Sequence, residues 1–159
     1  MSGPVPDLME PELSFAFEVR VDVDDAVRIG AHGEHDVLWY VAITGGTVSG
    51  PRLTGAVLGG GGDWYRDRDG TVTLDARYLL RAADGAVIDI ANRGFWRASP
   101  EVTARLEAGE TVDEREHYYR TSPVFTTDAA QHRWLTEMVF VGLARQQGPT
   151  ICIRFFAVD

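Results

Sequence analysis

The stretch that decides the fold is Gly45–Trp64, which reads GGTVSGPRLTGAVLGGGGDW. A glycine pair and a Gly-Pro turn open it, a strand-like run follows, and four glycines lead into an acid and a tryptophan. Glycine has no Cβ, so it allows backbones to approach closely, and within a strand pattern it marks a bulge, a bend or such an approach. The stretch therefore predicts a barrel corner or the floor of a pocket, from which Asp63 and Trp64 emerge together.

This run of glycines is not typical of a nucleotide-binding loop. A phosphate-binding loop would continue with Gly-Lys-Ser or Gly-Lys-Thr, and a dinucleotide site would need a helix directly after the glycines. Neither pattern follows in the chain. The sequence therefore gives no indication of a nucleotide cofactor.

Length and composition indicate one globular domain. The chain has 159 residues, of which 45% are hydrophobic, and this suffices for a sizeable core. The formal net charge of −9 argues against nucleic acid and anionic membranes as partners, because both require a basic surface. We expect a flexible lead-in over residues 1–12 and a single domain over residues 13–159. The acidic, proline-rich N-terminus lacks the apolar core of a signal peptide, so we expect a cytoplasmic protein.

Alternation of apolar and polar residues predicts several short strands, for example over residues 13–23 and 37–44. The glycine-rich stretch adds a strand near residues 52–58. Ser99-Pro100 is typical of a helix start, and residues 128–135 predict a second short helix. Many strands with only one or two short helices indicate a mainly β fold, a barrel or a sandwich. We expect a single-domain antiparallel β-barrel.

The clearest hairpin spans residues 71–92. The pair Asp84-Gly85 at its tip favours a two-residue type I′ turn. Counting back from this turn places Arg77 opposite Asn92, on the same face as Asp75. Both faces then mix polar and apolar groups. A barrel lumen with a polar patch would produce this mixture, and so would a solvent face with a few hydrophobic residues.

Several motifs occur in an order that resembles a known family. They are Gly50-Pro51-x-Leu53-x-Gly55, Asp63-Trp64, Leu74-Asp75-Ala76-Arg77-Tyr78, Asn92-Arg93-Gly94, Tyr119-Arg120-Thr121-x-Pro123-x-Phe125 and Trp134-Leu135. From about Gly30 to the C-terminus, the chain resembles the bacterial and fungal family called domain of unknown function 3237, or UPF0311. The resemblance implies a compact, self-associating β-barrel. Members occur in natural-product gene clusters, and a few are thought to be cofactor-free cyclases or isomerases.

No family-wide catalytic residue comes with this resemblance, so the catalytic candidates rest on residue chemistry. Asp75 and Arg77 are two apart on one strand and share a side, where an arginine keeps an acid ionised and offers a fork to a substrate carboxylate or enolate. Asp63, in a drier setting, would be the acid–base partner, and Tyr78 would donate to a developing oxyanion. The structural alternatives are a buried ion-pair network and ordinary core packing.

Further aromatic and polar residues are candidates for binding the substrate. Their rings and polar ends suit an apolar, oxygenated molecule. They are Trp39, Trp64, Asn92, Tyr119, Arg120, Trp134 and Glu137. Arg120 is equally suited to holding the turn that follows it, and Glu137 to the edge of a strand.

The histidines do not predict a metal site. His32 and His35 lie three apart in a polar loop, and the sequence contains neither an HExxH motif nor cysteine-rich spacing. We therefore expect no metal and no other cofactor.

The expected function is a cofactor-independent small-molecule enzyme with acid–base chemistry of the cyclase, isomerase or lyase type, in natural-product or aromatic metabolism. Its pocket would lie inside the β-barrel. The expected partners are a small-molecule substrate and further copies of the chain in a homo-oligomer. Two alternatives remain open: a non-catalytic binding or carrier barrel, and a structural subunit of an oligomer.

Overall fold

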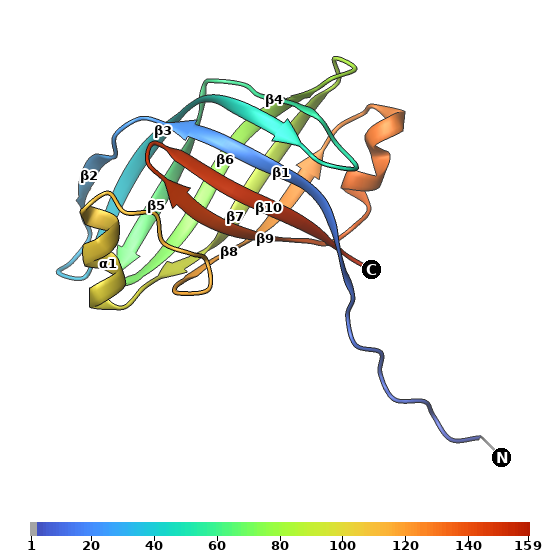
Figure 1. The fold of residues 1–159 in the computed structure, drawn as a ribbon, viewed down its shortest axis with the longest axis horizontal. Coiled ribbons are helices and arrows are strands. Elements are labelled where there is room, and N and C mark those ends of the chain that lie inside the picture. Colours follow the sequence, from blue (N-terminus) through green and yellow to red (C-terminus); the bar gives the residue numbers. More distant parts are fainter. Residues whose placement is uncertain (1–2) are drawn as a thin grey trace.

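The computed structural model describes residues 3–159, which form ten strands and two short helices. The strands are β1 (Leu13–Val23), β2 (Val27–Ala31), β3 (Asp36–Ser49), β4 (Gly55–Val57), β5 (Gly61–Arg68), β6 (Thr71–Ala82), β7 (Val87–Arg97), β8 (Tyr118–Thr126), β9 (Phe140–Gln147) and β10 (Thr150–Val158). The helices are α1 (Pro100–Glu107) and the 3-10 helix η1 (Ala130–Thr136). Residues 3–12 are exposed and lie outside the sheet, and Figure 1 shows them running away from the barrel.

All strands pair antiparallel in one sheet that closes on itself (Figure 1). The ring closes at β1, which pairs with β10 on one side and with β3 on the other. β1 and β2 both pair with β3, while β4 and β5 both lie between β3 and β6, so each of these couples fills one strand position. Ten strands with two such couples make an eight-stranded barrel. The predicted fold class, a mainly β antiparallel barrel with short helices, is confirmed.

The glycine-rich stretch does not form one strand over residues 52–58 as predicted. Instead β3 continues to Ser49, the short β4 follows, and β5 begins at Gly61. A Cβ on Gly61 would come within 2.5 Å of the carbonyl oxygen of Arg77 and the Cβ of Tyr78. The missing side chain therefore allows β5 to lie close against β6, which is the close approach that the glycines predicted.

The hairpin of β6 and β7 turns through three residues. The N–H of Gly85 donates to the carbonyl of Ala82, and Gly85 has a φ of 91°, as in a three-residue loop with a left-handed glycine. The predicted two-residue turn is wrong by one residue, and a slip of one residue moves the side chains of a strand to the opposite face. As a result, Asn92 lies opposite Ala76 and is buried, whereas the side chain of Arg77 is largely exposed.

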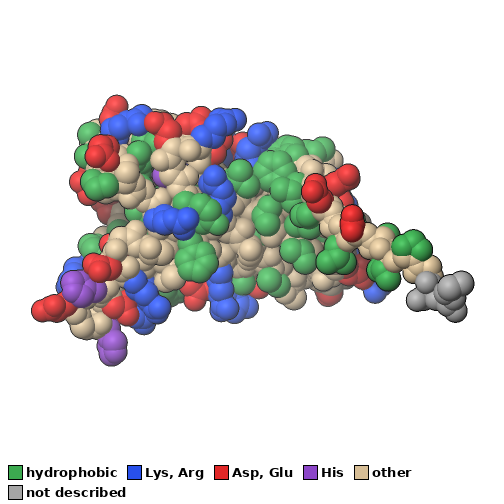
Figure 2. Space-filling model, turned by 90° about the horizontal axis from the view of Figure 1, so that it is seen from below, with side chains coloured by type: hydrophobic (Ala, Val, Ile, Leu, Met, Phe, Trp, Pro, Cys, Tyr) green, Lys and Arg blue, Asp and Glu red, His purple; other side chains and the backbone are tan. Residues whose placement is uncertain are grey.

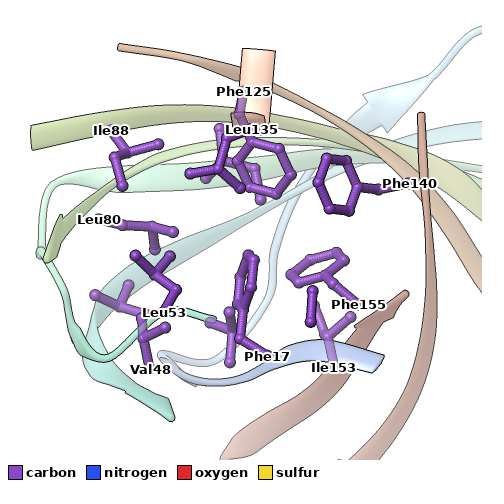
Figure 3. Close-up of a cluster of buried hydrophobic side chains, with 14 of the residues drawn as sticks. Phe17, Val48, Leu53, Leu80, Ile88, Phe125, Leu135, Phe140, Ile153 and Phe155 are labelled. Atoms are coloured by element: carbon purple, nitrogen blue, oxygen red, sulfur yellow. The ribbon is translucent and has the colours of Figure 1, made fainter. Parts of the chain in front are cut away.

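One half of the barrel is filled by a hydrophobic core. The rings of Phe17, Phe125 and Phe155 contact one another, with centroids 5.3–5.9 Å apart. Phe140 packs edge-on against Phe125, and Leu135 of η1 is buried against this group (Figure 3). This end of the barrel is therefore closed.

The helix α1 lies at the other end of the barrel from η1 (Figure 1). The side chain of Ser99 caps it by accepting the N–H of Val102 at 3.2 Å, and Pro100 occupies its first turn, as predicted. Gly109 follows the helix with a φ of 85°, which a glycine adopts without strain. No helix within residues 3–159 is long and apolar enough to cross a membrane.

Candidate functional site

A cavity of about 650 Å³ occupies the part of the barrel nearer to α1. The loop of residues 24–26, the turn of residues 148–149 and two residues of α1 line it, so it opens toward that end. Most of its wall is apolar or aromatic, and examples are Val41, Leu74, Trp39, Trp96 and Ile151. A cavity of this size is typical of a small-molecule site.

Asp63 is placed in this cavity by the alternation of β5. It pairs with Val41 of β3 and Ala76 of β6, which also line the cavity. Burial raises the pKa of its carboxyl to about 6, helped by the charge of Asp75. The backbone N–H of Asp75 donates to Oδ1 of Asp63 at 3.0 Å and opposes that rise. The carboxyl therefore exchanges its proton near neutral pH, as a general acid or base must.

Three tyrosines lie near enough to this carboxyl to be influenced by its charge. Tyr65 and Tyr119 line the cavity, and Tyr78 is buried without being part of its lining. Burial raises the pKa of each hydroxyl, and the negative charge of Asp63 raises it further. These hydroxyls therefore keep their protons at neutral pH and can act as hydrogen-bond donors.

Buried polar atoms without a partner mark the floor of the cavity. Asn92 and Thr121 line it and are only 3% and 5% exposed. Neither Oδ1 of Asn92 nor Oγ1 of Thr121 has a hydrogen-bonding partner among the described residues, and the same holds for the hydroxyl of Tyr78. Buried polar groups in proteins are nearly always paired, so the unpaired oxygens of Asn92 and Thr121 make this part of the cavity a candidate position for the polar groups of a ligand.

A second group of residues supports the aromatic wall from behind. The ring of His117 packs against Trp96 and Tyr119, with centroid distances of 6.4 and 6.3 Å. Arg120 does not line the cavity. Its guanidinium donates to the backbone carbonyls of Tyr119 and Glu114, at 3.0 and 3.2 Å. It therefore holds the segment that leads into β8. The predicted turn after Arg120 is wrong, because residues 121–123 belong to β8.

The expectation that Asp75 and Arg77 face the lumen is wrong. Asp75 pairs with Arg93 and Arg77 with Asp89, and the side chains of Asp75 and Arg77 are 57% and 71% exposed. They therefore lie on the outer surface of the barrel. Figure 2 shows one face of the molecule, on which acidic and basic side chains are interspersed. The three-residue hairpin loop pairs Asn92 with Ala76 and not with Arg77, and the closed barrel places the face with Ala76 and Asn92 inside, so Asp75 and Arg77 point outward.

Three predicted binding residues also lie away from the cavity. Trp64 follows Asp63 on β5, so it points outward, where it is 47% exposed and packs against Tyr40. Trp134 belongs to η1 at the closed end, beneath the guanidinium of Arg52. Glu137 is at the edge of the same segment and pairs with Arg133 at 2.6 Å.

The structure brings together the predicted residues Asp63, Trp39, Asn92 and Tyr119, with Tyr78 close by. Among the residues of the cavity that were not predicted are Tyr65, Trp96 and Thr121. Each lies two or four residues from a predicted one on the same strand. Since alternate residues of a strand share a face, this spacing was the signal that could have found them.

The histidines of the polar loop lie apart from this cavity. His35 is exposed and lies 3.3 Å from Asp69 and 3.6 Å from Glu34. Within residues 3–159, no three His, Cys, Asp or Glu side chains are grouped as a metal ion would require. The polar groups of the cavity are the carboxyl, hydroxyl and amide groups of its lining residues.

Comparison with known proteins gives relatives over nearly the whole chain. A family model described as "Protein of unknown function (DUF3237)" matches residues 11–158. A UPF0311 protein of Clostridium acetobutylicum is 31% identical over 156 residues, which cover 98% of this chain and 99% of that protein. The crystal structure of a conserved protein of unknown function from Rhodopseudomonas palustris has a TM-score of 0.90 at 30% identity, covering 96% of this chain and 100% of the other.

One relative has an activity in its name. The hydroalkoxylation enzyme of Penicillium herquei is 35% identical over 78 residues, which are 49% of this chain and 52% of that enzyme. The crystal structure of an enzyme from the same fungus has the same fold, with a TM-score of 0.71 at 20% identity, and covers 100% of this chain and 99% of the other.

Proposed function

The chain belongs to the DUF3237 family, also called UPF0311, and from this premise we propose that it is a small-molecule enzyme that works by acid–base catalysis inside its barrel. We infer as its reaction the addition of a hydroxyl group across a carbon–carbon double bond of the same molecule, which closes a ring. The partial relative from Penicillium herquei, a hydroalkoxylation enzyme, supports this choice of reaction. The observation that carries the proposal is the half-buried Asp63 carboxyl, which lies in the cavity among apolar and aromatic residues and has a pKa of about 6.

The proposed reaction needs only a proton carrier. The ionised Asp63 accepts the proton of the substrate hydroxyl while the oxygen forms a bond to one carbon of the double bond. The π electrons of that double bond form a C–H bond at the other carbon with the proton that Asp63 has taken up, and this returns Asp63 to its ionised form. One O–H bond and one π bond break, one C–O and one C–H bond form, and no electrons leave the substrate.

Other residues of the cavity would bind and orient the substrate. Burial raises the pKa of Tyr119, so its hydroxyl keeps its proton at neutral pH and can donate a hydrogen bond to a developing oxyanion. The unpaired Oδ1 of Asn92 accepts a substrate hydroxyl, and Oγ1 of Thr121 can donate or accept. Trp39 and Trp96 offer flat apolar surfaces to an aromatic or unsaturated body.

A carrier barrel without chemistry would use the same cavity. Such a carrier needs apolar walls and a few polar anchors, but it has no use for a buried carboxyl that titrates near neutrality. Asp63 therefore favours the enzyme over the carrier.

The test uses a panel of phenols and enones that carry a hydroxyl within ring-closing reach of a double bond. The reaction is run in D₂O, because hydroalkoxylation leaves one deuterium on carbon in an otherwise isomeric product. We expect Asp63→Asn to lower turnover by about 100-fold or more, the range of general acid–base catalysis. The matched control is Asp89→Asn, which removes a carboxylate from the outer wall. Full turnover by Asp63→Asn, or a cyclised product without deuterium, would contradict the proposal.

A further inference from the structure

Every charged residue that lines the cavity is acidic. The cavity contains no arginine, lysine or histidine, although the chain as a whole has 15 basic residues and four histidines. Two of its carboxylates, Asp63 and Asp67, are on β5. The others are Asp24 and Asp25 in the loop after β1 and Glu107 at the end of α1. A ligand with a negative charge would therefore meet no positive partner in this cavity.

These carboxylates are also unpaired. Within residues 3–159 the outer surface and loops carry 13 ion pairs, and none of them includes a carboxylate of the cavity. Asp67 accepts a hydrogen bond from the backbone of Gly70 at 3.0 Å, which leaves its charge in place. Arginines neutralise many of the carboxylates on the outside of the barrel, but no arginine in the described part of the chain pairs with the carboxylates of the cavity. The cavity therefore keeps a negative potential.

Two further features of the cavity favour a ligand site in this acidic region. Asn92 and Thr121 are more than nine-tenths buried, line the same cavity and have unpaired side-chain oxygens. The wall also presents the aromatic rings of Trp39, Tyr65 and Trp96. Such rings attract cations through their negative faces, so they act in the same direction as the carboxylates.

We propose that the cavity selects its ligand by charge: it accepts uncharged molecules, prefers those that carry a protonated amine, and excludes carboxylates, phosphates and other anions. Asp24, Asp25 and Glu107 are the specificity residues, since they come from the loop and the helix at the open end. The substrate enters as a neutral or cationic compound with an apolar body, and an acyl chain linked to a phosphate-bearing carrier does not fit. This inference rests on the proposed function for the choice of site, but it concerns binding and not turnover.

The test compares three ligands that share one apolar body: 2-(2-naphthyl)ethylamine, 2-(2-naphthyl)ethanol and 2-naphthylacetate. Binding is measured by calorimetry at pH 7.5 in low salt. We expect the amine to bind most tightly and the acetate most weakly, with about tenfold or more between them, because several carboxylates without counter-charges act together on the ligand and low salt screens them little. High salt should bring the amine and the acetate closer together.

A triple variant identifies the residues. Asp24→Asn, Asp25→Asn and Glu107→Gln together should reduce the preference for the amine to about threefold or less, as the loss of nearby charges implies. The matched control is Asp7→Asn, Glu10→Gln and Glu12→Gln, which changes the net charge equally in the exposed segment outside the barrel. That control should keep the wild-type ranking.

Three results would overturn the inference. They are 2-naphthylacetate binding as tightly as the amine, an unchanged preference in the variant with Asp24, Asp25 and Glu107 replaced, and no binding of any naphthyl ligand. The last result counts because the inference requires an accessible apolar cavity. A clear ranking in a protein without turnover would keep charge selection and contradict only the acid–base chemistry.

Discussion

The backbone N–H of Asp75 donates to Oδ1 of Asp63 at 3.0 Å, although the two side chains lie on opposite sides of the barrel wall. The carboxyl inside the cavity is thus held by the backbone of a residue whose own carboxylate faces solvent. Burial is the largest influence on the pKa of Asp63 and raises it, the hydrogen bond lowers it, and the outer charge raises it again. The raised pKa of Asp63 therefore depends on the strands β5 and β6, which separate its carboxyl from the solvent around Asp75.

Asp63→Asn should stabilise the protein at alkaline pH. Burial raises the folded pKa from the ordinary 3.8 to about 6, so the unfolded chain releases this proton first as the pH rises. Below pH 4 both states are protonated and the group contributes nothing. Between pH 4 and 6 the stability of the wild type falls, and above pH 6 the loss reaches about 3 kcal/mol.

Urea unfolding of wild type and Asp63→Asn at pH 4, 5, 6 and 8 measures this effect. Because asparagine does not titrate, the variant should gain stability over the wild type as the pH rises, and the gain should level off above pH 6. An advantage of the same size at pH 4 and pH 8 would show that the substitution acts through packing and not through the charge.

Asp75→Asn and Arg77→Ala test the corrected position of this pair. Both side chains are mostly exposed, so we expect each variant to keep turnover within about threefold of wild type, as surface substitutions do. Asp75→Asn retains the backbone N–H that reaches Asp63. A loss of orders of magnitude in either variant, with the fold intact by circular dichroism, would return these residues to the catalytic site.

Tyr119→Phe should lower turnover while leaving the fold intact. The substitution keeps the ring in the cavity wall and removes only the hydroxyl, which we place as a donor. Removal of one such donor typically lowers kcat by about 100-fold or more. Tyr118→Phe is the control, because this neighbour points to the outside and is 38% exposed. Equal rates for the two variants would exclude the hydroxyl of Tyr119 from the reaction.

Gly61→Ala should disturb the position of Asp63. The new Cβ would come within 2.5 Å of the carbonyl oxygen of Arg77, so β5 must move away from β6. We expect a loss of about 1–3 kcal/mol in unfolding free energy, as for other overpacked sites, together with lower turnover. In Gly45→Ala the new Cβ would lie 3.7 Å from its nearest neighbour, an ordinary contact, so this control should be close to wild type.

Local signals were sufficient for the elements of the fold. The Ser99-Pro100 helix start and the strand that begins at Leu13 both occur where their patterns predict them. Capping and alternation act between residues that are close in the chain, which is why a sequence reveals them.

The register of the β6–β7 hairpin could not be predicted in the same way. The pair Asp84-Gly85 suits a two-residue turn, yet the observed loop includes Ala83, with Gly85 in the left-handed conformation. Both loops use the same residue types, and the choice between them depends on how the flanking strands pack in the closed barrel. Because of that one residue, Asn92 pairs with Ala76 and shares its inner face, while Arg77 lies on the outer face.

The sequence by itself determined the mainly β class, the start of α1 and the close approach at Gly61, since each depends on neighbouring residues or on a missing side chain. Only the tertiary structure decided that Asp63, Asn92 and Tyr119, from three different strands, meet in one cavity. It also decided that Trp64 and Asp75, which adjoin cavity residues in the chain, lie outside it. The reason is that a strand exposes alternate residues to opposite faces, so closure of the barrel determines which face becomes the site.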